Sequence, residues 1–242
     1  MNYRDELFAS YRTVQALPTK PDLAKADHWG GPYDTYLRGW LPANREARIA
    51  DIACGNGYLL RYFLQRGYRN VQGVDISAEQ LAVAKQICEH VQLQKGDDFL
   101  RVNSNTFDLV TALDLIEHLT KDELLQFLRA AFGALRPGGR LVLQTPNCAS
   151  PLGIAVRYSD FTHEIGLTPN SLAWLMRLTG FQDYSAREQG PVSRGLKSSV
   201  RWFLWRVLRL SFIARESIET GSARGVYTRV FIASATKPGQ VS

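Results

Sequence analysis

From residue 48 onward the chain alternates short apolar runs with longer stretches whose apolar positions recur every three or four residues. The short runs are rich in branched and aromatic residues and predict buried strands, whereas the longer stretches predict amphipathic helices. Strands are predicted at 49–53, 71–74, 91–94, 107–113 and 140–145, with helices at 58–66, 78–90 and 121–135 between them. Strands that alternate with helices in this way build a parallel sheet covered on both faces.

Beyond Pro146 this pattern loosens into a long connection. A helix is predicted from Thr168 to Thr179, followed by strands at 181–188 and 225–235, which would complete a mostly parallel seven-stranded α/β sheet. The predicted organisation is an N-terminal helical cap at 1–47, a main domain at 48–236 with a C-terminal helical insertion at 190–222, and a flexible tail at 237–242.

The 242 residues carry a formal net charge of +6 that is unevenly distributed. Six basic residues and no acid lie between Arg194 and Arg215, so the excess belongs largely to the insertion. The three cysteines have no metal or disulfide spacing, which favours a reducing compartment. The first residues form no apolar signal core, and no apolar run approaches the ~18 residues of a membrane span. We therefore expect a cytoplasmic protein.

The turn after the first strand, Asp51-Ile-Ala-Cys-Gly-Asn-Gly57, carries the first chemical signal. Its glycines let a ligand approach the backbone, and the following helix offers unpaired N–H groups at its start. The second strand ends in Asp75, where a carboxylate can accept hydrogen bonds from both hydroxyls of a ribose. Dinucleotide-binding turns have a third glycine where this chain has Leu60, so a nucleoside with a small charged tail is favoured over a dinucleotide.

Four motifs, in order, resemble those of class I S-adenosylmethionine (SAM)-dependent methyltransferases. They are Asp51–Gly57, Gly73-Val-Asp75, Phe107–Leu119 and Leu135–Leu143. The resemblance implies a Rossmann-like fold and SAM as the methyl donor. The chain departs from the family pattern at Ala53, where glycine is usual, and this departure puts in doubt only the fine placement of the ligand.

The resemblance also implies roles for acidic residues. Asp75 would hold the ribose hydroxyls, and Asp97 would accept from the adenine amino group, with Asp98 as the competing choice. Asp97 and Asp98 could instead be turn residues. The complete predicted cofactor site is Asp51, Ala53, Gly55, Asn56, Gly57, Asp75, Ile76, Asp97, Asp98, Leu113 and Asp114.

The methionine end of the cofactor would be surrounded by Asp51, Gly55 and the backbone around Leu113 and Asp114. A carboxylate there can meet the ligand's ammonium group. Asp51 has an alternative role within the fold, in which its side chain bonds the N–H groups of the turn.

Methyl transfer to a hydroxyl requires removal of its proton, for which histidine has a suitable pKa. His118 follows the fourth strand and His163 lies in the loop after the fifth, so both belong to the edge of the sheet where ligands bind. The stretch Asp160–Glu164, which precedes a threonine–proline helix start, resembles methyltransferases encoded with polysaccharide or glycolipid pathways. We predict His163 as the general base, with His118 as its rival.

The Leu-Ile-Glu117-His118 stretch also resembles ubiquinone-pathway O-methyltransferases, in which the glutamate–histidine pair can take part in binding a divalent metal. A structural role is the alternative, in which the histidine bonds a backbone carbonyl at a helix start. Because the sequence shows no second carboxylate cluster, we assign no metal ligands.

Residues 198–213 predict a basic amphipathic helix. Three arginines (Arg201, Arg206, Arg209) share one face with two tryptophans (Trp202, Trp205), and three apolar residues (Phe203, Val207, Leu210) take the opposite face. This composition is typical of a helix that lies on an anionic membrane surface. The helix could instead pack on its own domain or on a second copy in a homodimer. Nucleic-acid binding is disfavoured, because no aromatic strand platform is evident.

These features together predict an O-methyltransferase that uses SAM and acts on a hydroxyl of a sugar in a glycan or lipid-linked saccharide, at the inner face of the cytoplasmic membrane. One alternative is a quinone or small phenolic acceptor with a divalent metal. Another is a non-catalytic, SAM-binding, membrane-associated partner.

Overall fold

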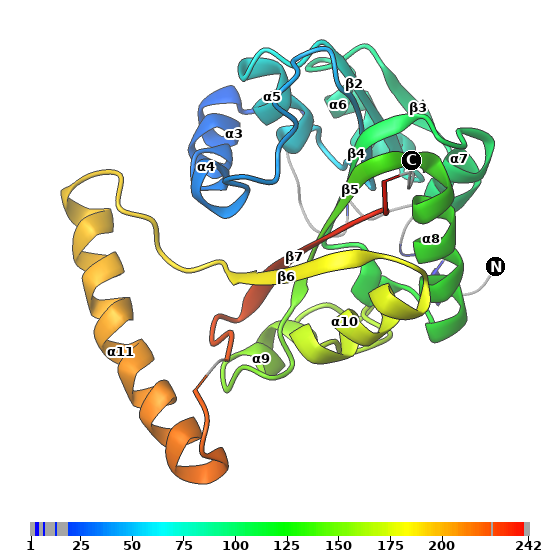
Figure 1. Cartoon of the computed structure of the whole chain (residues 1–242). Helices are drawn as coiled ribbons and strands as arrows, with labels where there is room; N and C mark the ends of the chain where they lie inside the picture. Colours follow the sequence, from blue (N-terminus) through cyan, green and yellow to red (C-terminus); the bar gives the residue numbers. More distant parts are fainter. Residues whose placement is uncertain (1–2, 5–6, 8–12, 14–18, 224, 240–242) are drawn as a thin grey trace.

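A computed structural model describes residues 3, 4, 7, 13, 19–223 and 225–239 of the chain. Its strands form one sheet in the order β3-β2-β1-β4-β5-β7-β6 (Figure 1). The strands are β1 (Arg48–Ile52), β2 (Asn70–Asp75), β3 (Val91–Leu93), β4 (Phe107–Leu113), β5 (Leu135–Pro146), β6 (Gln182–Glu188) and β7 (Val230–Thr236). The first five are parallel, whereas β7 lies antiparallel between β5 and β6. The predicted mostly parallel seven-stranded sheet is thereby confirmed.

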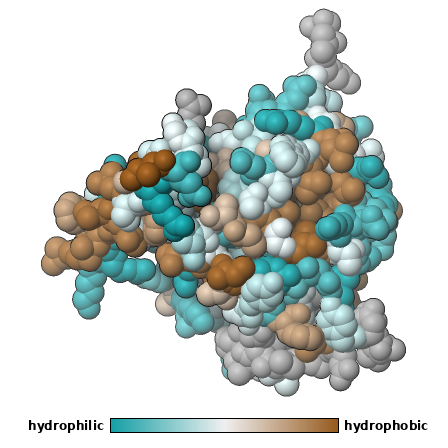
Figure 2. Space-filling model, turned by 90° about the horizontal axis from the view of Figure 1, so that it is seen from below, coloured by the Kyte–Doolittle hydropathy of each residue, from teal (hydrophilic) through white to brown (hydrophobic). Residues whose placement is uncertain are grey.

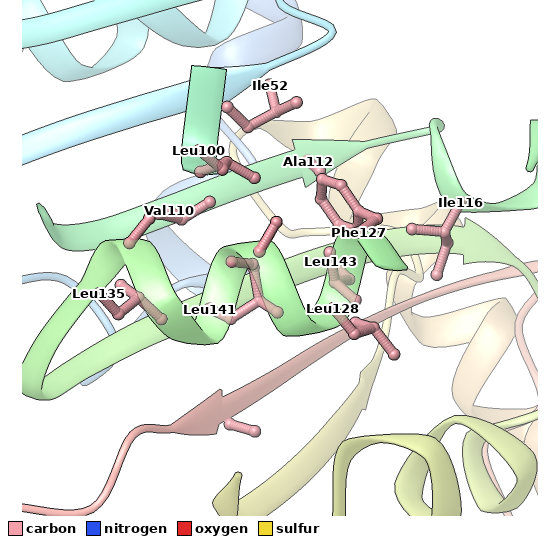
Figure 3. Close-up of a cluster of buried hydrophobic side chains, with 14 of the residues drawn as sticks. Ile52, Leu100, Val110, Ala112, Ile116, Phe127, Leu128, Leu135, Leu141 and Leu143 are labelled. Carbon is pink, nitrogen blue, oxygen red and sulfur yellow. The ribbon is translucent and has the colours of Figure 1, made fainter. Parts of the chain in front are cut away.

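Helices cover both faces of this sheet. The helices in the described part of the chain are α3 (Leu23–Gly30), α4 (Tyr33–Tyr36), α5 (Tyr58–Gln65), α6 (Ala78–Ala84), α7 (Gly96–Val102), η1 (Ile116–His118), α8 (Lys121–Ala134), α9 (Gly153–Arg157), α10 (Pro169–Leu178) and α11 (Leu196–Thr220). Successive strand residues point to opposite faces. Ala50 and Val110 therefore join the core formed with α7, α8 and α10 (Figure 3), while Ile49 and Leu109 join the core formed with α4, α5 and α6.

Several element boundaries differ from the prediction. The helix expected at 78–90 ends at Ala84, because the next residues tighten into turns in which the N–H of residue i donates to the carbonyl of residue i−3. The residues around Asp97 form α7 rather than a turn. The fifth strand begins at Leu135, five residues early, since Leu135 already pairs with Phe107 ahead of a register shift. The last strand begins at Val230 rather than at residue 225.

The two ends of the chain are partly described. The first part of the predicted N-terminal cap, residues 1–18, falls largely outside the described residues, and α3 and α4 are the helices of its later part. At the other end, Lys237 is tied to the body, because its carbonyl accepts from Gly138 N–H at 2.9 Å and its own N–H donates to the Gly139 carbonyl at 2.8 Å. The hydrogen-bonded part of the chain therefore extends into the segment predicted as a tail.

The insertion forms one helix of 25 residues, α11, which stands apart from the body (Figure 1). None of its residues is buried. One stripe attaches it to the sheet. Arg209 pairs with Glu188 of β6 at 2.9 Å, and the Phe212 ring stacks on Tyr227 with centroids 5.9 Å apart. None of the described helices is sufficiently long and apolar for a membrane crossing.

Candidate functional site

The turn after β1 is bent by residues with positive φ at Ala53 (56°), Gly55 (53°) and Gly57 (79°). A left-handed conformation costs a non-glycine residue about 1 kcal/mol or more, so Ala53 carries strain that glycine would not. Gly57 meets a second constraint, since a Cβ there would lie 3.2 Å from the Cα of Ala84 in α6. The glycine at 57 therefore serves close packing, while Ala53 and Gly55 face the cavity beyond the turn.

A cavity of about 220 Å³ lies where β1, β2 and β4 end. The predicted site residues that line it are Ala53, Gly55, Asp75, Ile76, Asp97, Asp114 and His118. The remaining predicted residues, Asp51, Asn56, Gly57, Asp98, Leu113 and His163, are not among its lining residues. The carboxyl ends of parallel strands are where α/β sheets bind ligands, so this position agrees with a binding site.

Asp75 is held at the tip of β2 by two backbone groups. Its carboxylate oxygens accept from Gly55 N–H at 2.9 Å and from Ser77 N–H at 2.8 Å. Burial raises the pKa of Asp75, and these N–H donors oppose the increase. Each oxygen retains a second lone pair, so the carboxylate can accept further hydrogen bonds from a ligand.

The two adjacent acids of α7 lie in different surroundings. Asp97 lines the cavity with 12% of its side chain exposed, and one oxygen pairs with Arg101 at 2.9 Å. Its buried Oδ1 has no hydrogen-bond partner among the described residues. Asp98 is 56% exposed and also pairs with Arg101. The Oδ1 atom of Asp97 lies 3.8 Å from Lys95 Nζ, an ion-pair distance beyond hydrogen-bond range. A buried acceptor without a hydrogen bond can take one from a ligand, which favours Asp97 over Asp98 as the adenine contact.

Three other predicted residues lie behind the cavity wall. Asp51 is buried and accepts from the Thr111 hydroxyl at 2.7 Å, rather than from the N–H groups of the turn. Leu113 packs against the core formed with α5 and α6. The buried Oδ1 of Asn56 has no partner in the described part of the chain. These residues support the turn and its strands, and do not line the cavity.

The two candidate histidines meet at the end of β4, with ring centroids 4.6 Å apart. His163 Nδ1 lies 2.8 Å from the Arg157 carbonyl oxygen, which can only accept, so Nδ1 carries the proton. His118 Nδ1 lies 2.8 Å from the Thr162 hydroxyl, which donates its own proton to Asp160. In both rings, therefore, the lone pair is on Nε2. Burial lowers the pKa of His118 to about 4, assisted by the charge of His163.

Glu117 completes a cluster with the two histidines. Ligand atoms of Glu117, His118 and His163 lie within 4.8 Å of one another. Glu117 is buried and accepts from the Thr145 hydroxyl at 3.0 Å, and its burial raises its pKa well above the usual range. One carboxylate and two imidazoles are a donor set that suits a divalent transition metal, which would also compensate the buried charge. The structure thus brings together three side chains that could hold a metal ion, whereas no metal ligands were assigned from the sequence.

A family model described as a methyltransferase domain matches residues 31–186. The chain belongs to this methyltransferase family. The assignment to class I SAM-dependent methyltransferases is confirmed by this match together with the fold.

Curated relatives match only part of the methyltransferase. A small RNA 2'-O-methyltransferase of Rattus norvegicus is 30% identical over 148 residues, which are 53% of this chain and 37% of the relative. A ubiquinone biosynthesis O-methyltransferase of Aeromonas salmonicida is 33% identical over 106 residues, 41% of this chain and 43% of the relative. The chain therefore spans about two fifths of the length of these relatives.

Solved structures share the fold across most of the chain. A SAM-dependent methyltransferase from Archaeoglobus fulgidus has a TM-score of 0.66 at 19% identity and covers 98% of this chain and 100% of that one. Phosphoethanolamine N-methyltransferase 2 of Haemonchus contortus, solved with SAM, has a TM-score of 0.61 at 18% identity over 87% of this chain and 53% of its own. These identities establish the shared fold alone.

The cavity of the methyltransferase fits SAM. Asp75 presents a carboxylate where a ribose is expected, and Ile76, with 51% of its surface exposed, offers an apolar surface for a ring. Two lining side chains, Asp97 and Gln80, each have a buried oxygen that accepts no hydrogen bond from the described residues. Ligand N–H and O–H groups can satisfy these acceptors.

We expect Asp51→Asn to change how the stability of the methyltransferase depends on pH. Burial raises the pKa of Asp51 from 3.8 to about 7, so the folded state favours the protonated carboxyl. Stability is then lost as the pH rises from the unfolded pKa towards 7, and the amide variant escapes this loss. Between pH 5 and pH 8 the variant should gain about 2 kcal/mol over the wild type, or about 4–8 °C in Tm. Parallel Tm curves across this pH range would contradict the assignment.

Some residues at the site were not identified from the sequence. Arg4 lines the cavity and donates to the His118 carbonyl at 2.7 Å and to Glu123 at 2.9 Å. Gln144 of β5 donates to both oxygens of Asp114, at 3.0 and 2.9 Å, and accepts from the Tyr33 hydroxyl at 2.7 Å. Arg4 belongs to the cap and Gln144 lies near the end of β5, and neither is part of a recognised motif.

Proposed function

We propose that this methyltransferase transfers the methyl group of SAM to a hydroxyl of a sugar in a glycan or lipid-linked saccharide, and that His163 removes the hydroxyl proton. The contact between His163 and His118 at the end of β4 carries this proposal. SAM supplies a methyl group on a reactive sulfonium, so the chain mainly has to align the acceptor and take its proton. The curated relatives described above are named for methyl transfer to oxygen, which supports an oxygen acceptor.

The proton acceptor is Nε2 of His163. The Arg157 carbonyl holds the opposite nitrogen as N–H and so orients the ring. The low pKa of His118 keeps this second imidazole neutral near pH 7, so it does not repel the imidazolium that His163 becomes. Asp114 lines the cavity nearby, and its carboxylate is held by Gln144, where it can accept from a ligand donor.

The sugar acceptor is supported by the loop and by aromatic side chains. The stretch Asp160–Glu164 before Thr168 has the order that resembles methyltransferases of polysaccharide pathways. Trp29, Tyr33 and Tyr36 line a groove beside the cavity, and aromatic rings are good surfaces for the apolar faces of sugars.

An activity screen tests this function. The purified full chain is incubated with methyl-labelled SAM and extracted glycolipids or polysaccharide, and labelled products are identified by mass spectrometry. A labelled methyl ether on a sugar supports the proposal. SAM binding without transfer to any hydroxylated acceptor would favour a non-catalytic SAM-binding partner instead.

Metal-assisted transfer to a quinone or small phenol is a second candidate, favoured by the cluster of Glu117, His118 and His163. A divalent ion there would hold and acidify the acceptor hydroxyl, and the histidines would be its ligands. Chelation followed by re-addition of single metals distinguishes the two mechanisms. Activity that survives chelation supports the histidine base, and activity that returns only with a metal supports the second candidate.

The proposal places the methyltransferase at the inner face of the cytoplasmic membrane through α11. Val200, Phe203, Leu204, Val207 and Leu208 recur at helical spacing and form one outward stripe. Phe203 is 59% exposed and Leu204 58% exposed, and apolar residues cover the projecting part of the surface in Figure 2. Arg201 and Arg206 border this stripe, as expected for contact with anionic headgroups.

The double variant Phe203→Glu, Val207→Glu should weaken binding to vesicles that contain phosphatidylglycerol by about 30-fold or more, because two apolar side chains that would enter the bilayer become charged. Vesicle sedimentation at low salt measures this. The matched control is Val102→Glu, Leu178→Glu, which charges two exposed apolar residues away from α11 and should bind as the wild type does. Absence of wild-type binding, or equal losses in both variants, would count against membrane contact.

A further inference from the structure

A large groove lies beside the cofactor cavity, between the cap, α11 and the ends of β5 and β7. Its volume is about 1250 Å³. Trp29, Tyr33 and Tyr36 of the cap line one side, and Trp205 of α11 lines the other. The groove is therefore formed by the parts of the chain that lie outside the four methyltransferase motifs.

The groove is strongly basic. Arg194, Lys197, Arg201 and Arg229 line it, and none of these four forms an ion pair with a carboxylate of the described residues. The acid among the lining residues, Asp27, is already paired with Arg61 at 2.6 Å. Asp34 is the ion-pair partner of Arg66, and its pKa is lowered chiefly by Arg66 and to a smaller extent by Arg194. Several cations without an ion-pair partner in one concave surface create a positive potential that attracts an anion.

One of these cations is seated against the backbone of the cap. A Cβ added to Gly31 would lie 1.3 Å from an Nη atom of Arg194, so any larger residue there would displace this guanidinium. Gly31 is buried, and the preceding Gly30 packs on Tyr62 of α5, which fixes the surface beneath the arginine. Arg194 is also anchored from its own segment, because its backbone N–H donates to the Ser198 hydroxyl at 2.8 Å. The guanidinium is thus positioned across the groove from α11.

The groove is linked to the reaction centre by one side chain. Gln144 lines the groove, and its amide nitrogen donates to Asp114, which lines the cofactor cavity. Its amide oxygen accepts from Tyr33 and also from Gln189, both groove residues. A ligand that rests in the groove therefore lies one side chain away from the cofactor cavity.

We propose that this groove binds the phosphate- or diphosphate-bearing part of the acceptor through Arg194, Lys197, Arg201 and Arg229. The inference rests on the proposed function, because it names the class of sugar acceptor as a phosphorylated or diphosphate-linked saccharide. Guanidinium and ammonium groups form charge-assisted hydrogen bonds with phosphate oxygens, and the aromatic side chains accept the sugar ring beside them.

Tryptophan fluorescence provides a direct test, because Trp29 and Trp205 both line the groove. The SAH-loaded full chain is titrated with inorganic pyrophosphate, with glucose 1-phosphate and with glucose. The wild type should bind both phosphates and show no saturable response to glucose. The triple variant Arg194→Gln, Lys197→Gln, Arg201→Gln should bind pyrophosphate about 30-fold or more weakly, because three charged contacts are lost.

A matched triple variant provides the control. Lys121→Gln, Arg177→Gln, Arg215→Gln removes the same charge from exposed positions that do not line the groove, and should bind pyrophosphate within about twofold of the wild type if local contacts dominate. Equal losses in the two triple variants would overturn the site. Gly31→Ala leaves every charge in place but displaces Arg194, and its weaker pyrophosphate binding supports the stated geometry.

Competing ligands separate the sources of phosphate. Displacement of pyrophosphate by phosphatidylglycerol vesicles assigns the same cations to a lipid-borne phosphate, and resistance to such vesicles assigns them to a soluble one. Both results support the anion site. A short single-stranded RNA that binds more than 100-fold tighter than pyrophosphate, and depends on the same three cations, would overturn the saccharide assignment in favour of nucleic acid.

The outcomes also separate this inference from the proposed function. Pyrophosphate binding needs no methyl transfer, so it can be found even if no hydroxyl is methylated, in which case the proposed function fails and the anion site stands. Methylation of uncharged saccharides that is unchanged in the groove triple variant would instead overturn the inference and leave the proposed function intact.

Discussion

The His163→Ala variant is expected to lose methyl transfer by about 10²- to 10⁴-fold while it keeps its affinity for S-adenosylhomocysteine (SAH). The affinity should be kept because His163 does not line the cofactor cavity. Methyl transfer should be lost because the His163 ring, which contacts His118 at the end of β4, is the proposed proton acceptor. The loss should appear in kcat, because alanine removes the proton acceptor without removing a ligand contact. SAH release with the acceptor found in the screen gives kcat, and calorimetry gives the SAH dissociation constant.

His90→Ala is the matched control, because His90 is an exposed histidine remote from the cluster. It should retain wild-type values of both kcat and SAH affinity. Full activity of His163→Ala would reject His163 as the base. If His118→Ala alone lost activity, the role would pass to His118, the rival identified from the sequence.

The Asp75→Ala variant should bind SAM about 100-fold more weakly than the wild type. The carboxylate can accept from two ribose hydroxyls, and each charge-assisted hydrogen bond contributes about 1.5 kcal/mol or more. Gly55 N–H and Ser77 N–H would also lose their acceptor, so the turn after β1 would be held less firmly. Calorimetric titration with SAM, on a variant shown to be folded by circular dichroism, measures the change.

Asp98→Ala controls for loss of an acidic residue near the same cavity. Asp98 is an exposed member of α7 that forms an ion pair with Arg101, and it is not a lining residue of the cavity. Its SAM affinity should stay within about twofold of the wild type. A comparable loss in both variants would mean that general charge around the cavity, and not a contact with Asp75, determines affinity.

The fold was largely predictable, because the spacing of apolar residues along the chain shows which faces of the strands and helices are buried. The β4 strand was predicted with its observed bounds at 107–113, because it is largely apolar and central, with both faces covered. The capping box at Thr120 likewise fixed the start of α8. The start of β5 was missed, because the Arg136–Gly139 stretch has the composition of a turn. It nevertheless lies between Leu135, which pairs with Phe107, and Arg140, which pairs with Leu109, and two backbone hydrogen bonds join it to Lys237.

The site was predictable where one motif places one side chain at the cavity. Asp75 and Asp97 belong to this class, and both line the cavity. Contacts between distant segments were not predictable in this way. The chain Tyr33–Gln144–Asp114 joins the cap to two strands, and the close approach of Glu117 and His163 depends on how the loop after β5 folds back. Such contacts depend on tertiary structure, which spacing within a motif does not encode.

The position of β7 between β5 and β6 has a consequence for folding. β6 has β7 as its neighbour in the sheet, and residues 189–229 separate the two strands. As the chain emerges from the ribosome, β6 and α11 are both made before the strand that pairs β6 to the sheet. The pairing of β6 with β7 joins residues that are far apart in the sequence, and such contacts slow folding. During that interval the apolar stripe of α11 is already synthesised, so early contact with a membrane or a chaperone would protect it from aggregation.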